Sequence, residues 1–156
     1  MNVTMQDLCS ITEDVMTTVL GLAAIAAVTP RTAAPAAPWL ESRIGIHGRW
    51  SGELTVACGP QLAALLASAF FGEPVSIDRV DDADAALREL ANILAGHVNA
   101  LMAAPSRISL PHSVGAAATT AAATGRVPDL IAAFCCEDQE LLVTLRETTP
   151  PGGGEA

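Results

Sequence analysis

Apolar residues recur at helical spacing over three stretches of the chain. The longest covers residues 81–102, where apolar side chains return at steps of three and four residues, the spacing that lines one face of a helix. A first helix is predicted over residues 5–27, and a short one over residues 61–71, which Gly59-Pro60 opens because proline is tolerated in a first turn. The apolar face of the longest helix comprises Leu87, Leu90, Ala91, Leu94, Val98, Leu101 and Met102.

Alternating apolar and polar residues predict strands in the rest of the chain. Residues 39–58 contain two strands, and residues 107–110 and 116–124 form a second pair around Pro111. The order of elements predicts an α+β domain whose mostly antiparallel sheet is packed under two long helices. A helix followed by a strand pair occurs twice, which indicates an internal duplication. A terminal hairpin has strands at residues 131–136 and 141–145.

The length of 156 residues suits one domain with a substantial core. We predict that residues 1–147 form this domain. The tail, residues 148–156, is predicted to be disordered because it contains Pro-Pro-Gly-Gly-Gly. The net charge of −9 argues against nucleic acid as a partner and favours a basic patch, a metal or a cationic side chain opposite this protein.

The cysteines and the apolar stretches indicate a cytoplasmic protein. The cysteines show no C-x-x-C spacing, so no zinc site is expected, and reduced thiols suit the cytoplasm. Residues 16–28 are apolar but shorter than the roughly 20 residues that a bilayer span needs. Glu13 and Asp14 precede them, the wrong sign of charge for a signal peptide. No membrane association is therefore expected. The four cysteines are Cys9, Cys58, Cys135 and Cys136.

The outer face of the longest helix is the candidate functional surface. At about 100° per residue, Glu89 and Asn92 lie opposite the apolar stripe, and their spacing of three makes their side chains neighbours. Gly96 and Ala100 follow along the same side. An exposed helix face normally carries long charged side chains. A face this bare would let another protein come close to Glu89 and Asn92.

Other catalytic patterns are missing from the sequence. It has no Ser-His-Asp set, no glycine-rich phosphate loop before a helix and no H-E-x-x-H string, and its three histidines stand apart. Acidic residues gather before the longest helix, where they could hold a divalent cation or stabilise the helix N-terminus by capping and by the dipole. The capping interpretation is favoured. These residues are Asp78, Asp81, Asp82 and Asp84.

Three features stand in a common order along the chain. They are the segment Ile-Gly-Ile-His-Gly within residues 44–52, the string Glu89-x-x-Asn92-x-x-x-Gly96 on the long helix, and Pro111 after it. Together they resemble the CheC/CheX/FliY family of bacterial chemotaxis phosphatases, and CheX most closely. The likeness covers nearly the whole chain apart from the tail. The string is loose by itself and gains specificity from its place on the second long helix, between two strand pairs.

The resemblance implies a phosphatase that acts on the phosphoaspartate of a CheY-like response regulator. On this resemblance, Asn92 would enter the active site of the receiver domain and orient water for in-line attack on phosphorus. Glu89 would pair with the receiver's lysine beside the phosphoryl group. Gly96, Ala85 and Ala100 would let the receiver approach closely. No cofactor is expected on this chain, because the receiver itself would hold Mg²⁺.

The sequence departs from the family pattern at two places. Ala85 stands where many members have Asp or Ser, and Pro111 lies nearer to Asn92 than is usual. Two other functions stay open: a non-catalytic member that binds a receiver, and a dimerisation or scaffold module that pairs through strand edges. In the first helix Met16 follows Glu13 by three residues, so one site per chain is predicted, as in CheX.

Overall fold

The computed structural model describes residues 3–26, 39–48, 50–102, 106–114 and 129–148. The predicted strand at residues 116–124 and most of the predicted tail lie outside these ranges. The described elements are, in order, α1 (Met5–Leu20), β1 (Ile25–Ala26), β2 (Leu40–His47), β3 (Gly52–Cys58), α2 (Pro60–Phe71), α3 (Val80–Ala100), β4 (Arg107–Ile108), β5 (His112–Val114), β6 (Leu130–Cys136) and β7 (Gln139–Glu147).

The strands form one sheet in the order β1-β6-β7-β3-β2-β4, with β5 also paired to β2. Its centre is the junction of two hairpins, β2–β3 and β6–β7, which meet where β3 pairs with β7. Each described strand pair is antiparallel. The prediction of an α+β domain with a mostly antiparallel sheet is therefore confirmed.

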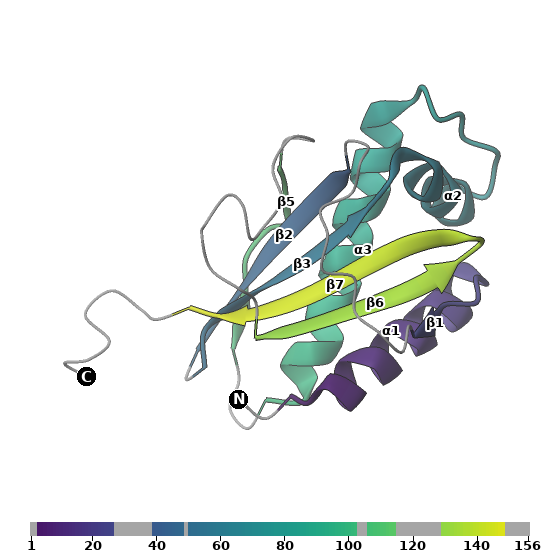
Figure 1. Cartoon of the computed structure of the whole chain (residues 1–156). Helices are drawn as coiled ribbons and strands as arrows, with labels where there is room; N and C mark the ends of the chain where they lie inside the picture. The colour runs from purple at the N-terminus through teal and green to yellow at the C-terminus, as the bar shows by residue number, and fades with distance from the viewer. Residues whose placement is uncertain (1–2, 27–38, 49, 103–105, 115–128, 149–156) are drawn as a thin grey trace.

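The helices cover one face of this sheet (Figure 1). Helix α3 contacts β2 and β3, whereas α1 contacts β6. Successive strand residues point to opposite faces, so every second residue of each central strand faces the helices. None of the described helices is long and apolar enough to cross a bilayer. The helix-facing side chains of the three central strands are fully buried, and they include Ile44, Ile46, Leu54, Val56, Val143 and Leu145.

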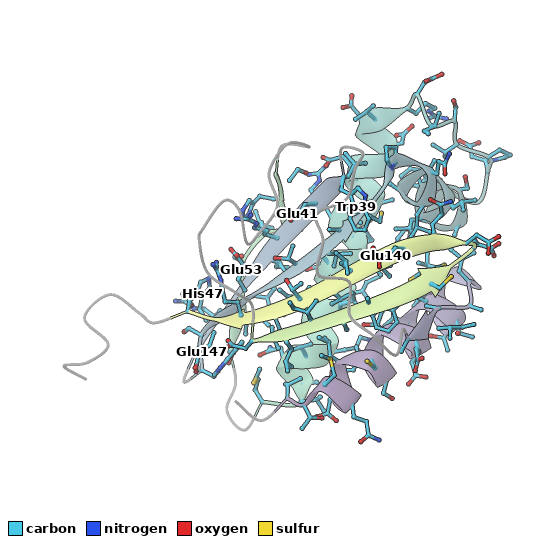
Figure 2. All side chains as sticks on the ribbon, in the orientation of Figure 1. Trp39, Glu41, His47, Glu53, Glu140 and Glu147 are labelled. Atoms are coloured by element: carbon cyan, nitrogen blue, oxygen red, sulfur yellow. The ribbon has the colours of Figure 1, made fainter. Side chains whose placement is uncertain are left out.

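The opposite face of the sheet carries charged side chains that pair along and across the strands. Arg43 donates from Nε to Glu41 at 2.8 Å on β2, and Arg146 of β7 donates to Glu53 of β3 at 2.9 Å. Figure 2 shows Glu41 and Glu53 on their strands. Apolar residues toward the helices and ion pairs on the other side fix which face of the sheet holds the core.

Helix α1 is shorter than its apolar pattern predicts. It ends at Leu20 because Gly21 adopts a left-handed conformation, with φ of 67°, and the amide of Leu22 bonds back to the carbonyl of Met16. The predicted continuation of the helix to residue 27 is wrong. Ile25 and Ala26 instead form the edge strand β1, which pairs with β6. An apolar run of Ala, Ile and Leu does not by itself distinguish a helix from a short strand.

The second predicted strand pair also differs from expectation. The strand expected at residues 107–110 is confined to Arg107–Ile108, and His112, expected in the connection, begins β5. Both short strands pair with β2, at opposite ends of it. Proline has no amide hydrogen, so Pro111 suits the break between them. Pairing with β2 places β5 beside the N-terminal half of α3.

The terminal hairpin and helix α2 follow the prediction closely. The turn between β6 and β7 contains only Glu137 and Asp138, with φ of 50° and 60°, the positive values of a two-residue turn that matches sheet twist. Strand β7 therefore begins at Gln139, two residues earlier than predicted. Helix α2 begins at Pro60 and ends before Gly72, whose φ is 73°.

The thiols differ sharply in accessibility. Cys58 and Cys136 are buried, Cys9 is partly buried, and Cys135 is exposed. Burial, with a smaller effect of Cys136, raises the pKa of the Cys58 thiol from 9.0 to about 12. An ionised thiolate is the reactive form, so Cys58 is protected both sterically and chemically.

We expect one thiol, Cys135, to react rapidly with an aromatic disulfide reagent in the native protein at pH 8. Cys58 and Cys136 should react only after unfolding, and Cys135→Ser should remove the fast phase. Because the unfolded chain releases the Cys58 proton near pH 9.0 and the folded chain only near pH 12, this group's contribution to stability is complete below pH 9.0 and is lost between the two values. Rapid native labelling mapped to Cys58 by mass spectrometry would contradict this picture.

Candidate active site on helix α3

Helix α3 presents one buried and one open side. Its buried residues recur at steps of three and four and contact the sheet and helix α2. The helix ends at Ala100, so Leu101, predicted to lie on the apolar face, follows the last turn and is 44% exposed. The sheet orients α3 through its buried residues, and the opposite side faces outward. The buried residues are Ala83, Ala86, Leu87, Leu90, Ala91, Leu94, Ala95 and Val98.

Glu89 and Asn92 are both exposed on the open side of α3. Neither side chain has a hydrogen bond or an ion pair with the described parts of the chain. Their spacing of three brings the side chains to adjacent positions on the helix surface. A carboxylate and a carboxamide without internal partners are available to a second molecule.

Small residues surround this pair. Gly96 and Ala100 are exposed, and Ala85 is partly exposed. A Cβ added to Gly96 would have no atom within 4 Å apart from its own helix and chain neighbours, so nothing in the described structure requires glycine there. We call the surface formed by Ala85, Glu89, Asn92, Gly96 and Ala100 the α3 face.

A network of three interacting side chains borders the α3 face, and the sequence patterns did not single it out. Ser113 of β5 donates from Oγ to Oδ2 of Asp84 at 2.6 Å, and Nε of Arg88 lies 3.5 Å from the same oxygen. Asp84 and Arg88 have the four-residue spacing of an ion pair on a helix, which was a usable signal in the sequence. Ser113 carries no such signal, because only the pairing of β5 with β2 brings it to the helix.

The acidic residues at the start of α3 act through their position near the helix dipole rather than as side-chain caps. Asp81 and Asp82 lie in the first turn, where negative charge is favourable against the helix dipole. The N-cap position is Arg79, and no side chain caps the helix there, so the predicted capping hydrogen bond is wrong. Arg79 instead pairs with Asp82 at 2.5 Å. Among the described residues no group of three potential ligands could hold a metal ion.

Helix α1 does not present a second pair. Met16 is fully buried, and Glu13, partly buried, accepts a hydrogen bond from the amide of Ala26 at 3.4 Å. The glycines of the segment 44–52 serve the fold. A Cβ at Gly45 would lie 2.7 Å from Nε2 of His47. A Cβ at Gly48 and at Gly52 would likewise meet Ser106 and Trp50, so these glycines let side chains lie close against the backbone.

The fold is that of CheX proteins of known structure. CheX from Vibrio vulnificus superimposes with a TM-score of 0.70 at 16% identity, covering 90% of this chain and 96% of that one. CheX from Desulfovibrio desulfuricans gives a TM-score of 0.65 at 19% identity, with the same coverage of 90% and 96%. The complex of CheX with CheY, BeF3 and Mg²⁺ from Borrelia burgdorferi gives 0.70 at 16% identity, covering 94% of this chain and 100% of that one.

The family follows from the sequence itself. The model of the family described as chemotaxis phosphatase CheX matches residues 41–135, and the chain belongs to this family. The matched region contains all five residues of the α3 face. No curated protein sequence matches the chain.

Proposed function

We propose that this protein hydrolyses the phosphoaspartate of a CheY-like receiver domain, using the α3 face. The observation that supports this most is the exposure of Glu89 and Asn92 side by side, without partners among the residues that the structure describes, within the region that matches the CheX family. We assign the activity to one domain, residues 1–147, with one site per chain.

Asn92 is the proposed catalytic residue. An acyl phosphate is already activated, so its hydrolysis depends on positioning and charge stabilisation more than on a strong base. A carboxamide can accept a hydrogen bond from water and donate another without being ionised. Asn92, inserted into the receiver's pocket, would hold a water in line with the phosphorus–oxygen bond to be broken. The receiver would supply the Mg²⁺, as the Borrelia complex contains Mg²⁺ together with CheY and BeF3.

Glu89 is proposed to fix the orientation of the two proteins. It lies one helical turn from Asn92, so an ion pair with the receiver's lysine would place the carboxamide beside the phosphoryl group. Opposite charges across an interface contribute register and a faster encounter as well as affinity. The net charge of −9 makes an attraction to a cationic side chain of the partner consistent with the whole chain.

The small residues of the α3 face give a prediction that separates folding from binding. Gly96→Ala should stabilise the protein by about 0.5–1 kcal/mol, because alanine has a higher helix propensity than glycine at an exposed position inside a helix. The added Cβ would contact no other described part of the protein. Gly96→Leu should leave thermal stability near that of the alanine variant but weaken receiver binding, because the larger side chain keeps the two surfaces apart. Equal receiver affinity for wild type and Gly96→Leu would place the interface elsewhere.

The proposed function is tested with a panel of CheY-like receiver domains charged with acetyl phosphate and then freed of the donor. Loss of the phosphoryl group is followed with and without this protein at one hundredth of the receiver concentration. Acceleration supports the phosphatase. Ala85, where many relatives have Asp or Ser, is the feature that favours a receiver-binding protein without activity, and binding without acceleration would select that function. If the protein neither binds a receiver nor accelerates the reaction, the remaining function is that of a dimerisation module. Sedimentation would detect the dimer that pairing through strand edges forms.

A further inference from the structure

We propose that Arg88 is a second catalytic residue, which contacts the phosphoryl group of the receiver from the border of the α3 face and is held in place by Asp84 and Ser113. The inference rests on the proposed function and adds a cationic contact to it. Arg88 precedes Asn92 by four residues, so the two side chains are neighbours one helical turn apart, with Cβ atoms about 5–6 Å from each other. A molecule that touches Asn92 is therefore within reach of the guanidinium.

The guanidinium is positioned by an ion pair but forms no hydrogen bond with the described residues. Its side chain is 44% exposed, and in its ion pair with Asp84 the distance from Nε to Oδ2 is 3.5 Å. No hydrogen bond joins Arg88 to any described residue. The terminal nitrogens form a planar fork that suits two oxygens of a phosphoryl group.

Asp84 and Ser113 orient this fork. Asp84 is 28% exposed in its side chain, and the 2.6 Å bond from Ser113 ties it to strand β5. A carboxylate beside Nε of an arginine leaves open the end of the fork, where both terminal nitrogens can donate to a second partner. The chain from Ser113 through Asp84 to Arg88 thus connects the sheet with the border of the α3 face.

Charge supports the same assignment. Arg88 is the only arginine or lysine on α3, and the chain as a whole carries 17 acidic residues against 8 basic ones. An acidic protein that approaches a phosphoryl anion needs a local cation to offset repulsion. In phosphoryl transfer, an arginine supplied by a second protein can stabilise the charge on the equatorial oxygens of the transition state.

The test uses the full chain and a receiver that the wild type dephosphorylates. Affinity is measured for the receiver charged with BeF3 and Mg²⁺ and for the uncharged receiver, and kcat and KM are measured with the phosphorylated form. We expect Arg88→Ala to lower kcat/KM about tenfold and to reduce the preference for the charged receiver by a similar factor. Arg88→Lys should recover part of both effects. Asp84→Asn should cause a smaller loss of the same kind, as expected of a positioning residue.

Arg79→Ala is the matched control. Arg79 is also exposed and also paired with an aspartate, Asp82, but it lies at the N-cap position of α3, and its removal changes the net charge equally. Equal effects of Arg79→Ala and Arg88→Ala would show that the change in net charge alone accounts for the loss, and this would overturn the proposal. An unchanged preference in Arg88→Ala would overturn it as well. If Asn92→Ala slows turnover while Arg88→Ala does not, only the role of Arg88 fails, whereas a wild type without activity defeats the proposed function itself.

Discussion

Replacing Asn92 by alanine is expected to slow dephosphorylation of the receiver roughly a hundredfold, which corresponds to about 2.7 kcal/mol in the barrier. The receiver's own Mg²⁺ and lysine remain in place, so a slow intrinsic reaction continues. Binding should change little, because the remaining residues of the α3 face still meet the partner. A mutation that lowers kcat with little change in affinity removes an interaction made mainly in the transition state.

Asn99→Ala provides the control for this variant. Asn99 lies on the same helix but donates from Nδ2 to the carbonyl of Ser106 at 3.2 Å, so its loss should lower stability and leave turnover per folded molecule unchanged. Single-turnover loss of phosphoryl from the charged receiver gives both rates. A rate for Asn92→Ala equal to that of the wild type would defeat its catalytic assignment.

Reversing the charge of Glu89 is expected to weaken binding of the charged receiver at least about thirtyfold. Glu89→Lys would set a cation against the receiver's lysine, and an unpaired or repelled charge at an interface costs about 2–5 kcal/mol. The fold should be unaffected, because Glu89 is exposed and has no partner among the described residues. Titration calorimetry at low and moderate salt would measure the change and its ionic part.

Two variants make this result specific. Glu89→Gln keeps the size of the side chain and removes only the charge, so it should lose less affinity than Glu89→Lys. Asp14→Lys reverses an exposed charge on a different helix, α1, and should bind nearly as the wild type does. Similar losses in Asp14→Lys and Glu89→Lys would indicate long-range repulsion instead of a contact.

The candidate site was predictable because it depends on the period of one helix. Buried residues at steps of three and four fix the rotation of α3 against the sheet, and the same period sends Glu89 and Asn92 to the open side. Hairpins were predictable for a similar reason, since each is specified by strand alternation and by a turn between neighbours in sequence. These features depend on residues that are close to one another in the sequence, so they can be predicted from the sequence alone.

Features that depend on distant pairing were not predictable. The apolar residues 22–27 continue the pattern of α1, and only the left-handed Gly21 and the partner strand β6 turn Ile25 and Ala26 into a strand. The sequence patterns did not single out Arg88, because its support, Ser113, is 25 residues further along the chain and reaches Asp84 through the pairing of β5 with β2. The roles of Glu89 and Asn92 stay predictions until a partner is in place.

The most direct measurement is a crystal structure of this protein with a receiver domain held in its phosphorylated form by BeF3 and Mg²⁺. We predict that the receiver lies on the α3 face, that the Asn92 carboxamide is within hydrogen-bond distance of the beryllofluoride or of a water bound to it, and that the Glu89 carboxylate faces a lysine. A receiver bound elsewhere, with Asn92 still in contact with solvent, would contradict the proposed mechanism.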